Sequence, residues 1–335
     1  MHSITYFYMK FSNYLKGSIQ HIPWIGKLLI LLGIYLIGEY TFALITVQII
    51  NAVFPGMDFL QFITGFDKIN TVDEISLQQE HALKIYQFGT SFGRFIVVAL
   101  LYIYLTGENA IKSLSLDKNI KSVNYITVLL IVMASGAIIS VVYEWNQTLH
   151  LPKSSAELEE TMRRFEDQAK IQTEVFLRTT VFAGFIVNLI IVGLLAAVGE
   201  EIFFRGVLQN LFFKWSRNPH VAIWVAAFVF SFIHFQFFGF FPRLLMGALM
   251  GYLYYYSGSL WSAILAHFIN NTATVVAYYL MNKGIIETNI AETSSLWAAL
   301  IAAPFLFLLL RYFKRNETSL SIADGKRLDD SVLDR

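Results

Sequence analysis

Residues 182–205 read FAGFIVNLIIVGLLAAVGEEIFFR, an apolar run that ends in two carboxylates and a guanidinium, those of Glu200, Glu201 and Arg205. About 20 apolar residues are enough for a helix to cross the hydrocarbon core of a bilayer. A charged side chain inside that core costs about 3 kcal/mol, so charges there are usually paired or face a wet cavity. The stretch therefore predicts a membrane-spanning helix that carries a functional site.

The composition of the whole chain predicts a polytopic membrane protein. Of its 335 residues, 56% are apolar and only 15% are charged, which is more apolar surface than one soluble globule could bury. The net charge of +1 and the lack of a dense basic stripe argue against a nucleic-acid partner. Because the chain has no cysteine, disulfides, thiolate metal sites and cysteine nucleophiles are excluded.

Apolar runs of spanning length recur, and we expect an all-α membrane bundle of about eight transmembrane helices with an intramembrane polar site. The run from Phe176 to Trp215 would be about 60 Å long as one helix. It should therefore kink near Gly193 or Gly199, or form a separate helix after Gly199. The expected spans lie near 25–54, 88–106, 123–143, 177–198, 221–238, 243–257, 260–281 and 296–313.

The distribution of basic residues predicts the orientation. Lysine and arginine gather in the segments 10–27, 107–122, 214–219 and 311–315, whereas the 55–87 loop is acidic. With eight spans all four basic segments fall on one side, which the positive-inside rule makes cytoplasmic. We expect a multi-pass protein of the cell (plasma or inner) membrane with both termini in the cytoplasm. The N-terminal residues lack the pattern of a cleaved signal peptide.

We expect four regions along the chain. Residues 1–175 would form an N-terminal membrane region with about three spans. It would begin with an interfacial helix over residues 4–22, or equally a frayed aromatic tail, and end with an external amphipathic helix that starts at a capping-box pattern, Ser154-Ser155-Ala156-Glu157. Residues 176–281 would be the core that carries the site, 282–313 the last span, and 314–335 a disordered cytoplasmic tail.

Reactive polar side chains recur inside the apolar runs of the second half. Glu201 and Arg205 are four residues apart and can pair on one helical face, whereas Glu200 is rotated by about 100°. Counted from the Asn218-Pro219 turn, Glu200 and His234 lie at comparable depth, and His267 and Asn271 share a face. Each residue alone has a structural explanation, as a hydrogen-bond partner between helices. Together they indicate a site. The polar side chains in these runs are Glu200, Glu201, Arg205, His234, His267, Asn270 and Asn271.

Such a set suits hydrolysis. A carboxylate beside an imidazole can take a proton from water, while an imidazole and an asparagine amide can donate to an oxyanion. The sequence contains no G-x-S-x-G and no H-E-x-x-H motif. Every aspartate falls in a predicted loop or tail, which excludes a pair of membrane aspartates. Glutamate-activated water is the remaining chemistry.

Three motifs resemble those of the CPBP family, the membrane proteins related to the type II CAAX prenyl endopeptidase and to bacterial Abi and bacteriocin-immunity proteins. The resemblance covers roughly residues 176–281, about a third of the chain, with further similarity at Phe204-Arg205-Gly206 and Leu208-Gln209. The family pattern E-E-x-x-x-R, F-x-x-x-H and H-x-x-x-N reads here as Glu200-Glu201-x-x-x-Arg205, Phe230-x-x-x-His234 and His267-x-x-x-Asn271.

The resemblance implies an intramembrane endopeptidase that needs no cofactor and cuts a membrane-associated protein or peptide, CAAX-like or not, lipidated or not. It implies that Glu200 is the general base and that His234 positions the water. It further implies an oxyanion hole formed by His267 and Asn271. Glu201 and Arg205 would brace the site, and Phe230 would shape the pocket.

Two alternatives stay open on the residues alone. In the first, Glu200, His234 and His267 hold Zn²⁺, because a carboxylate and two imidazoles form a plausible catalytic ligand set. In the second, the chain is a non-catalytic scaffold or immunity protein, or a proton-coupled transporter that uses the same ionisable groups. Glu39, in the first expected span, lies outside the motifs. It would either pair with Arg94 of the second span or lie in a kink near Gly38 that admits water.

Overall fold

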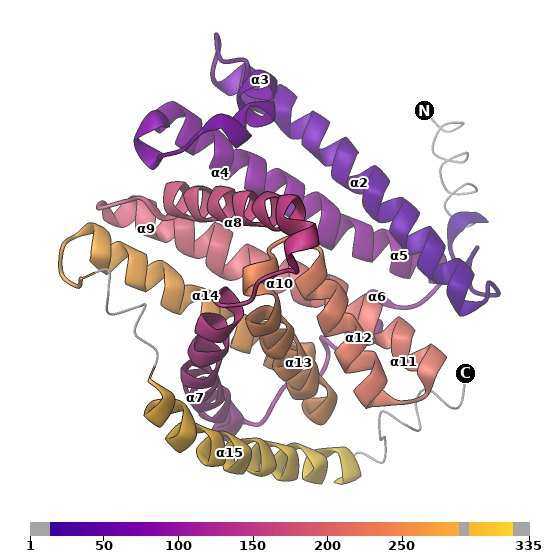
Figure 1. Cartoon of the computed structure of the whole chain (residues 1–335). Helices are drawn as coiled ribbons and strands as arrows, with labels where there is room; N and C mark the ends of the chain where they lie inside the picture. The colour runs from indigo at the N-terminus through magenta and orange to yellow at the C-terminus, as the bar shows by residue number, and fades with distance from the viewer. Residues whose placement is uncertain (1–13, 288–294, 324–335) are drawn as a thin grey trace.

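The computed structural model describes residues 14–287 and 295–323, and every regular element within these ranges is helical (Figure 1). Seven helices in these ranges are long and apolar enough to cross a membrane, and an eighth apolar helix is shorter. The expectation of a multi-pass all-α bundle of about eight spans is therefore confirmed. Figure 1 shows the fourth span, labelled α9 to α11, running through the middle of the bundle, with α2 and α4 on one side and α7 and α15 on the other.

Most of the spans have bounds close to those expected from apolar length, but the second begins at Leu77 and not near residue 88, and the fourth continues to Ser216 and does not end near residue 198. The first span is α2 (Trp24–Val53), the second joins α4 (Leu77–Ser91), η3 (Phe92–Val97) and α5 (Val98–Thr106), and the third is α7 (Ser122–Gln147). The fourth joins α9 (Phe182–Asn188), η5 (Leu189–Leu195), α10 (Ala196–Glu201), η6 (Ile202–Gln209) and α11 (Asn210–Ser216). The remaining ones are α12 (Pro219–Phe232), α13 (Phe240–Ser257), α14 (Leu260–Asn282) and α15 (Leu296–Ala323).

The fourth span is one helical stretch of 35 residues, Phe182–Ser216, with no separate helix after Gly199. It contains two π-helical segments, η5 and η6, and Gly193 lies in the first. Such segments mark irregularities in a helix and are frequent at functional sites. Gly199 has another role, because a Cβ there would lie 3.3 Å from the Cβ of Phe95. The glycine therefore lets the second span approach closely beside Glu200.

The expected span at 221–238 is wrong at its C-terminal end. Helix α12 begins at Pro219, capped by the Asn218 side chain, and ends at Phe232. A turn follows, in which Phe235 adopts a left-handed conformation with a φ of 52°. A short 3-10 helix, η7 (Phe237–Gly239), then leads into α13. His234 consequently lies in a turn between two helices and not inside a helix.

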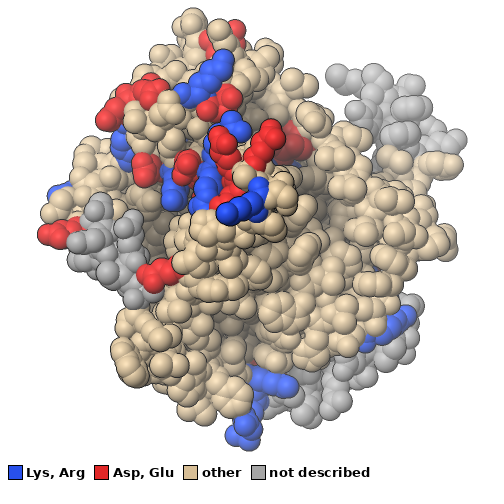
Figure 2. Space-filling model, viewed as in Figure 1, with Lys and Arg blue, Asp and Glu red and all other residues tan. Residues whose placement is uncertain are grey.

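Helix α8 (Ala156–Leu177) confirms the expected amphipathic helix before the fourth span. Figure 2 shows acidic and basic side chains gathered over α8, whereas much of the remaining face is neither acidic nor basic. The capping box predicted at Ser154–Glu157 is wrong, because Ser154 lies in a 3-10 turn and the N-cap of α8 is Ser155, which makes no side-chain hydrogen bond to the helix. Glu159 instead accepts from Arg163 and from the backbone of Leu151, which fastens the start of α8 to the preceding loop.

Both ends of the described chain differ from the prediction. The expected interfacial helix lies partly outside the described residues, and the backbone of 16–22 forms turns, because Gly17 has a φ of 76° and donates to the Tyr104 carbonyl. Helix α15 continues to Ala323, where a disordered tail was expected from residue 314. The Glu317 carboxylate is buried and accepts from the Asn124 amide, so α15 and α7 are fastened together. Residues 324–335 of that expected tail lie outside the described residues.

The Gly247-x-x-x-Gly251 pattern on α13 forms a close helix contact. A Cβ on Gly247 would lie 3.2 Å from the Cβ of Ala227, and a Cβ on Gly251 would lie 2.9 Å from the Cγ2 of Ile223. Both neighbours belong to α12. The two glycines therefore place α12 and α13 close together on one side of the site.

Candidate active site

A fully buried ion pair lies at the centre of the site. Arg205 Nη1 donates to Glu201 Oε1 at 2.7 Å, which confirms the pairing predicted from their spacing. The same oxygen lies 2.7 Å from His267 Nδ1. Exposure is 0% for Glu201 and 1% for Arg205, so the charges are shielded from solvent by protein. Glu201 thus joins α10 to α14 and sets the orientation of the His267 ring.

Glu200 lies on the other side of the same imidazole. Its Oε2 is 3.8 Å from His267 Nε2, and its side chain is 16% exposed, whereas Glu201 is inaccessible. The two adjacent carboxylates therefore differ in role. Glu201 is bound by Arg205 and His267, whereas Glu200 remains accessible to solvent. The structure places Glu200 beside His267, and no ion pair with His234 occurs among the described side chains.

Phe230 packs between the polar groups. The Arg205 guanidinium lies 4.9 Å from the Phe230 ring centroid, and the ring centroids of His234 and His267 lie at 5.1 and 6.2 Å. Arg205 Nη2 also donates to the Gly247 carbonyl at 2.9 Å. Arg205 and Phe230 thus link the fourth span to α12 and α13.

The His234 ring is oriented by a hydrogen bond at Nδ1, which leaves Nε2 available for another partner. Its Nδ1 lies 2.7 Å from the Phe230 carbonyl oxygen, an acceptor, so Nδ1 carries the proton in this bond. In a neutral ring, Nε2 then has a lone pair available for water or substrate. The Phe230 ring, which contacts both imidazoles, joins this turn to the polar cluster.

Asn271 binds the backbone of the fourth span. In the π-helical segment η5, the Ala196 N–H donates to Ile191 O and Gly193 O, so Val192 O loses its usual α-helical donor. Asn271 Nδ2 supplies one instead at 2.9 Å. Asn270 Nδ2 lies 3.3 Å from Asn271 Oδ1, so the two neighbouring amides form a short chain.

The proposed zinc ligands do not form a metal site as placed. No group of three histidine, cysteine or acidic side chains stands close enough to hold a metal ion among the described residues. Glu200 and His267 approach each other through Oε2 and Nε2, while His234 uses Nδ1 in its bond to Phe230 O. As placed, the structure brings together two of the three proposed zinc ligands, Glu200 and His267.

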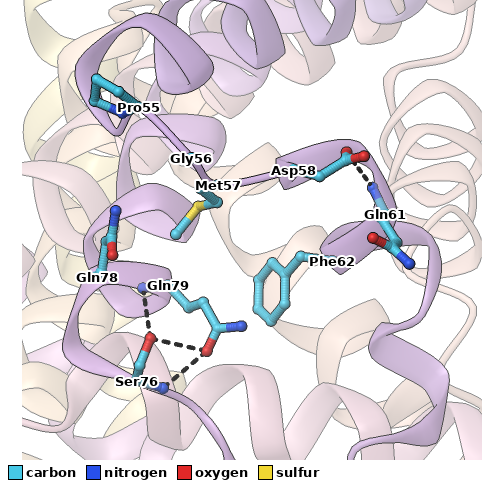
Figure 3. A pocket seen from close by; sticks show the side chains of 9 residues that line it. All are labelled: Pro55, Gly56, Met57, Asp58, Gln61, Phe62, Ser76, Gln78 and Gln79. Carbon is cyan, nitrogen blue, oxygen red and sulfur yellow. Dashed lines mark hydrogen bonds between the residues drawn. The ribbon is translucent and has the colours of Figure 1, made fainter.

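A pocket elsewhere in the described chain is unrelated to this site. It has a volume of about 550 Å³ and lies between the start of α4 and the segment that joins α2 to the short helix α3 (Phe59–Thr64) (Figure 3). Its polar side chains serve as local caps, because Asp58 accepts from the Gln61 N–H, and Ser76 and Gln79 form a capping box. Because these groups are committed to the backbone, the cavity offers no comparable reactive pair.

The ion pair expected of Glu39 is confirmed. Arg94 Nε lies 3.1 Å from Glu39 Oε2, with both side chains partly buried, and Arg94 Nη2 donates to Thr90 Oγ1. The pair joins α2 to the second span, beside Gly38, whose added Cβ would meet Val98. Its position supports the structural explanation for these two charges.

Sequence reasoning missed the side chains that hold the turn carrying His234. Asn146 and Gln147 at the end of α7 donate to the Phe237 and Phe238 carbonyls at 3.1 and 3.2 Å. Arg243 on α13 donates to both the carbonyl and the side chain of Gln236. The sequence does show these polar residues near the ends of otherwise apolar helices. Because polar helix ends are common in membrane proteins, this pattern alone does not indicate that the residues bind the turn.

The fold and site together define a polytopic membrane protein with a buried Glu–Arg–His cluster. The family model described as "Type II CAAX prenyl endopeptidase Rce1-like" matches residues 182–273, a segment that contains all of the motif residues. The resemblance predicted from the motifs is thus confirmed for this segment.

One curated relative, "Uncharacterized protein YpbD" from Bacillus subtilis (strain 168), is 30% identical over 107 residues, or 31% of this chain. The alignment spans 49% of that relative, about half its length. No solved structure gave a significant match to the chain.

Proposed function

We propose that this chain is an intramembrane endopeptidase that hydrolyses a peptide bond of a membrane-associated protein or peptide. The observation that carries the proposal is the contact between Glu200 and His267, with His267 held from behind by Glu201. A solvent-accessible carboxylate beside an oriented imidazole, inside an apolar bundle, is a combination that a structural helix contact does not need. The match of residues 182–273 to a family of prenyl endopeptidases supports the same activity.

The proposed reaction uses water as the nucleophile. Glu200 takes one proton from the water, and the oxygen attacks the carbonyl carbon to give a tetrahedral oxyanion. The proton then passes to the amide nitrogen as the carbon–nitrogen bond breaks, which yields a carboxylic acid and an amine. His234, through the free Nε2, orients the water.

His267 and Asn271 are the proposed oxyanion donors. His267 can donate from Nε2 when both ring nitrogens carry a proton, since Nδ1 faces Glu201. Asn271 Nδ2 is engaged with Val192 O, so it would donate its second N–H or exchange partners when substrate binds. Hydrogen bonds of catalytic groups commonly rearrange in this way between the free and substrate-bound states.

The substrate and the orientation are parts of the proposal. The family resemblance favours a protein substrate at the membrane, and whether it carries a lipid group is an outcome of the test. We also propose that both termini are cytoplasmic in the cell membrane, because four basic segments fall on one side of an eight-span bundle. Since the chain has no cysteine, single-cysteine variants labelled from either side would test this directly.

The decisive experiment compares peptide termini in cells that produce parent, Glu200→Gln or Glu160→Gln protein at equal levels. Glu160 is an exposed glutamate on α8 and serves as the control for loss of a carboxylate. New termini should appear with the parent and with Glu160→Gln and should be absent with Glu200→Gln. If Glu200→Gln produces the same termini as the parent, the proposed activity is wrong.

A further inference from the structure

Helix α8, which is not one of the membrane-spanning helices, contacts the segment that carries His234. The Arg163 guanidinium lies 4.2 Å from the ring centroid of Phe238, a residue of η7 that is 1% exposed. Gln168, on the same helix, donates to two backbone carbonyls of the loop before α4. Helix α8 is therefore fastened to that loop at one place and packs against η7, just beyond His234, at another.

Glu166 is a buried acidic residue of this helix. It is 7% exposed, and its Oε2 has no hydrogen-bond partner among the described residues. Burial raises the pKa of the Glu166 carboxyl, whereas the charge of Arg243 and a hydrogen bond from the Phe238 N–H are among the effects that lower it. A buried carboxylate costs free energy unless its neighbours compensate for the lost water. The neighbours that do so here belong to η7 and to α13.

Arg243 connects Glu166 to the segment that carries His234. Its Nη1 donates to the Gln236 side-chain oxygen at 2.7 Å, and its Nη2 donates to the Gln236 carbonyl at 2.5 Å. The guanidinium also lies against Gly239, where a Cβ would be 2.7 Å from Nη1. Its Nε is buried and has no hydrogen-bond partner among the described residues. The charge of Glu166 therefore adds an attraction that hydrogen bonds alone do not give.

We propose that Glu166 is a positioning residue for His234, which it holds in place by fixing Arg243 and, through Arg243, the backbone two residues after His234. This proposal rests on the proposed function. Phe235, next to His234, has a φ of 52°, a left-handed conformation that a bulky side chain adopts only at a cost in free energy. The turn would therefore relax where contacts from other elements are lost, and the His234 imidazole would move with it.

Arg243 is the main counter-charge of Glu166. Lys170 and Asp167, which lie near Glu166 on α8, affect its pKa less than Arg243 does. Charged groups on α4 and η2 (Val72–Glu74), which also pack against α8, form ion pairs of their own, Glu80 with Lys84 and Asp73 with Arg178. A change at Glu166 should therefore be transmitted chiefly to Arg243.

The test compares Glu166→Gln, which removes the charge and keeps the size of the side chain, with Glu160→Gln on the exposed face of α8. Both are made as the full chain in membranes, and thermal unfolding is measured alongside cleavage. The probe is a synthetic peptide that spans a bond whose cleavage depends on Glu200. At mildly alkaline pH, kcat of Glu166→Gln should fall about 10-fold with KM nearly unchanged, because a misplacement of about 1 Å can cost ~100-fold in rate. Glu160→Gln should match the parent.

The pH dependence distinguishes positioning by the charge from packing. A protonated Glu166 resembles glutamine, so the ratio of parent kcat to Glu166→Gln kcat should fall toward unity as the pH is lowered through the pKa of Glu166. A packing effect leaves this ratio independent of pH. Titration of Glu200 affects parent and variant alike and cancels in the ratio.

Two further measurements test the route through Arg243. In Arg243→Gln protein, the additional change Glu166→Gln should lower kcat little further, because residues that act through one another are not additive. The second measurement needs no substrate. In NMR spectra of protein with isotope-labelled histidine, the His234 signal, assigned by its loss in His234→Gln, should shift in Glu166→Gln and stay in place in Glu160→Gln.

The outcomes separate the two proposals. An unchanged kcat and an unchanged His234 signal in Glu166→Gln, with cleavage still dependent on Glu200, overturn the positioning role but not the proposed function. A loss of kcat that is the same at every pH, or an equal further loss in Arg243→Gln protein, also overturns the positioning role. Cleavage that does not depend on Glu200 refutes the proposed function, and the His234 signal alone then decides whether Glu166 positions that ring.

Discussion

Replacing Arg205 by methionine should strongly destabilise the protein. The guanidinium donates to Glu201 Oε1 at 2.7 Å and to the Gly247 carbonyl at 2.9 Å, and it is 1% exposed. Arg205→Met leaves the Glu201 carboxylate buried with His267 as its partner. Loss of one partner of a buried ion pair costs about 3–5 kcal/mol. The free energy of unfolding, measured by SDS titration of the full chain in mixed micelles, should fall by this amount.

A double variant distinguishes electrostatics from packing. Glu201→Leu/Arg205→Met removes both charges, and replacing a whole buried pair by apolar residues is often neutral or stabilising. The double variant should therefore recover more than half of the stability lost in Arg205→Met. It should still be inactive, because His267 Nδ1 no longer has the carboxylate that orients its ring.

The control is Arg163→Met on α8. Arg163 and Glu159 have the same spacing and the same 2.7 Å separation, but their ion pair lies at the surface. Its loss should change stability far less than the loss of Arg205. If Arg205→Met costs less than about 1 kcal/mol, or if the double variant is no more stable than Arg205→Met, the reasoning is refuted.

Three further predictions follow from contacts described above. Asn271→Ala should lower the free energy of unfolding by about 1 kcal/mol in the same SDS titration, because the Val192 carbonyl in η5 loses the hydrogen bond from the Asn271 amide. An unchanged free energy of unfolding would show that this hydrogen bond contributes nothing to stability. Glu39→Arg and Arg94→Glu should each cost about 3 kcal/mol and lower the yield of monodisperse protein, whereas the double swap should restore it; a double swap that behaves like the single variants contradicts the pairing. Hydrogen bonds, first from Arg163, hold the pKa of Glu159 at about 2, below the usual 4.5. The stabilisation is present above about pH 4.5 and is lost as the pH falls towards 2; an NMR titration of this carboxyl with a midpoint near its ordinary value would show that the bonds do not form.

The parts of the site that the sequence predicted correctly depend on local geometry. Glu201 and Arg205 are one helical turn apart, and their pairing follows from that spacing even though the segment that follows is π-helical. The pairing of Glu39 with Arg94 was also accessible, because an unpaired charge in a span is costly and few partners of opposite sign are available. The spans themselves followed from apolar length.

The parts that the sequence did not predict depend on contacts distant in the chain. Residues 233–241 are so rich in aromatic and aliphatic side chains that nothing local ends the helix at Phe232. The helix ends where Asn146, from the third span, binds the backbone on the far side of the turn. Likewise, the hydrogen bond from Asn271 could not be predicted without knowing that a π-helical segment leaves Val192 O without its usual backbone donor. The burial of Glu317 could not be predicted without knowing that Asn124 of α7 lies opposite it.

Because α12 is short, the site depends on residues outside the segment that carries the motifs. The 14 residues of α12 rise about 21 Å from the basic turn near Arg217, less than the roughly 30 Å of a hydrocarbon core. With the Arg217 turn at the membrane surface, the backbone around His234 would leave its helix at membrane depth, where non-helical peptide groups must be satisfied by protein or by water. Asn146 and Gln147 meet that requirement from outside the matched segment 182–273. The segment that carries every motif residue is therefore not an autonomous module: excised or grafted without the third span, it would lose the polar contacts that allow it to expose a histidine inside a bilayer.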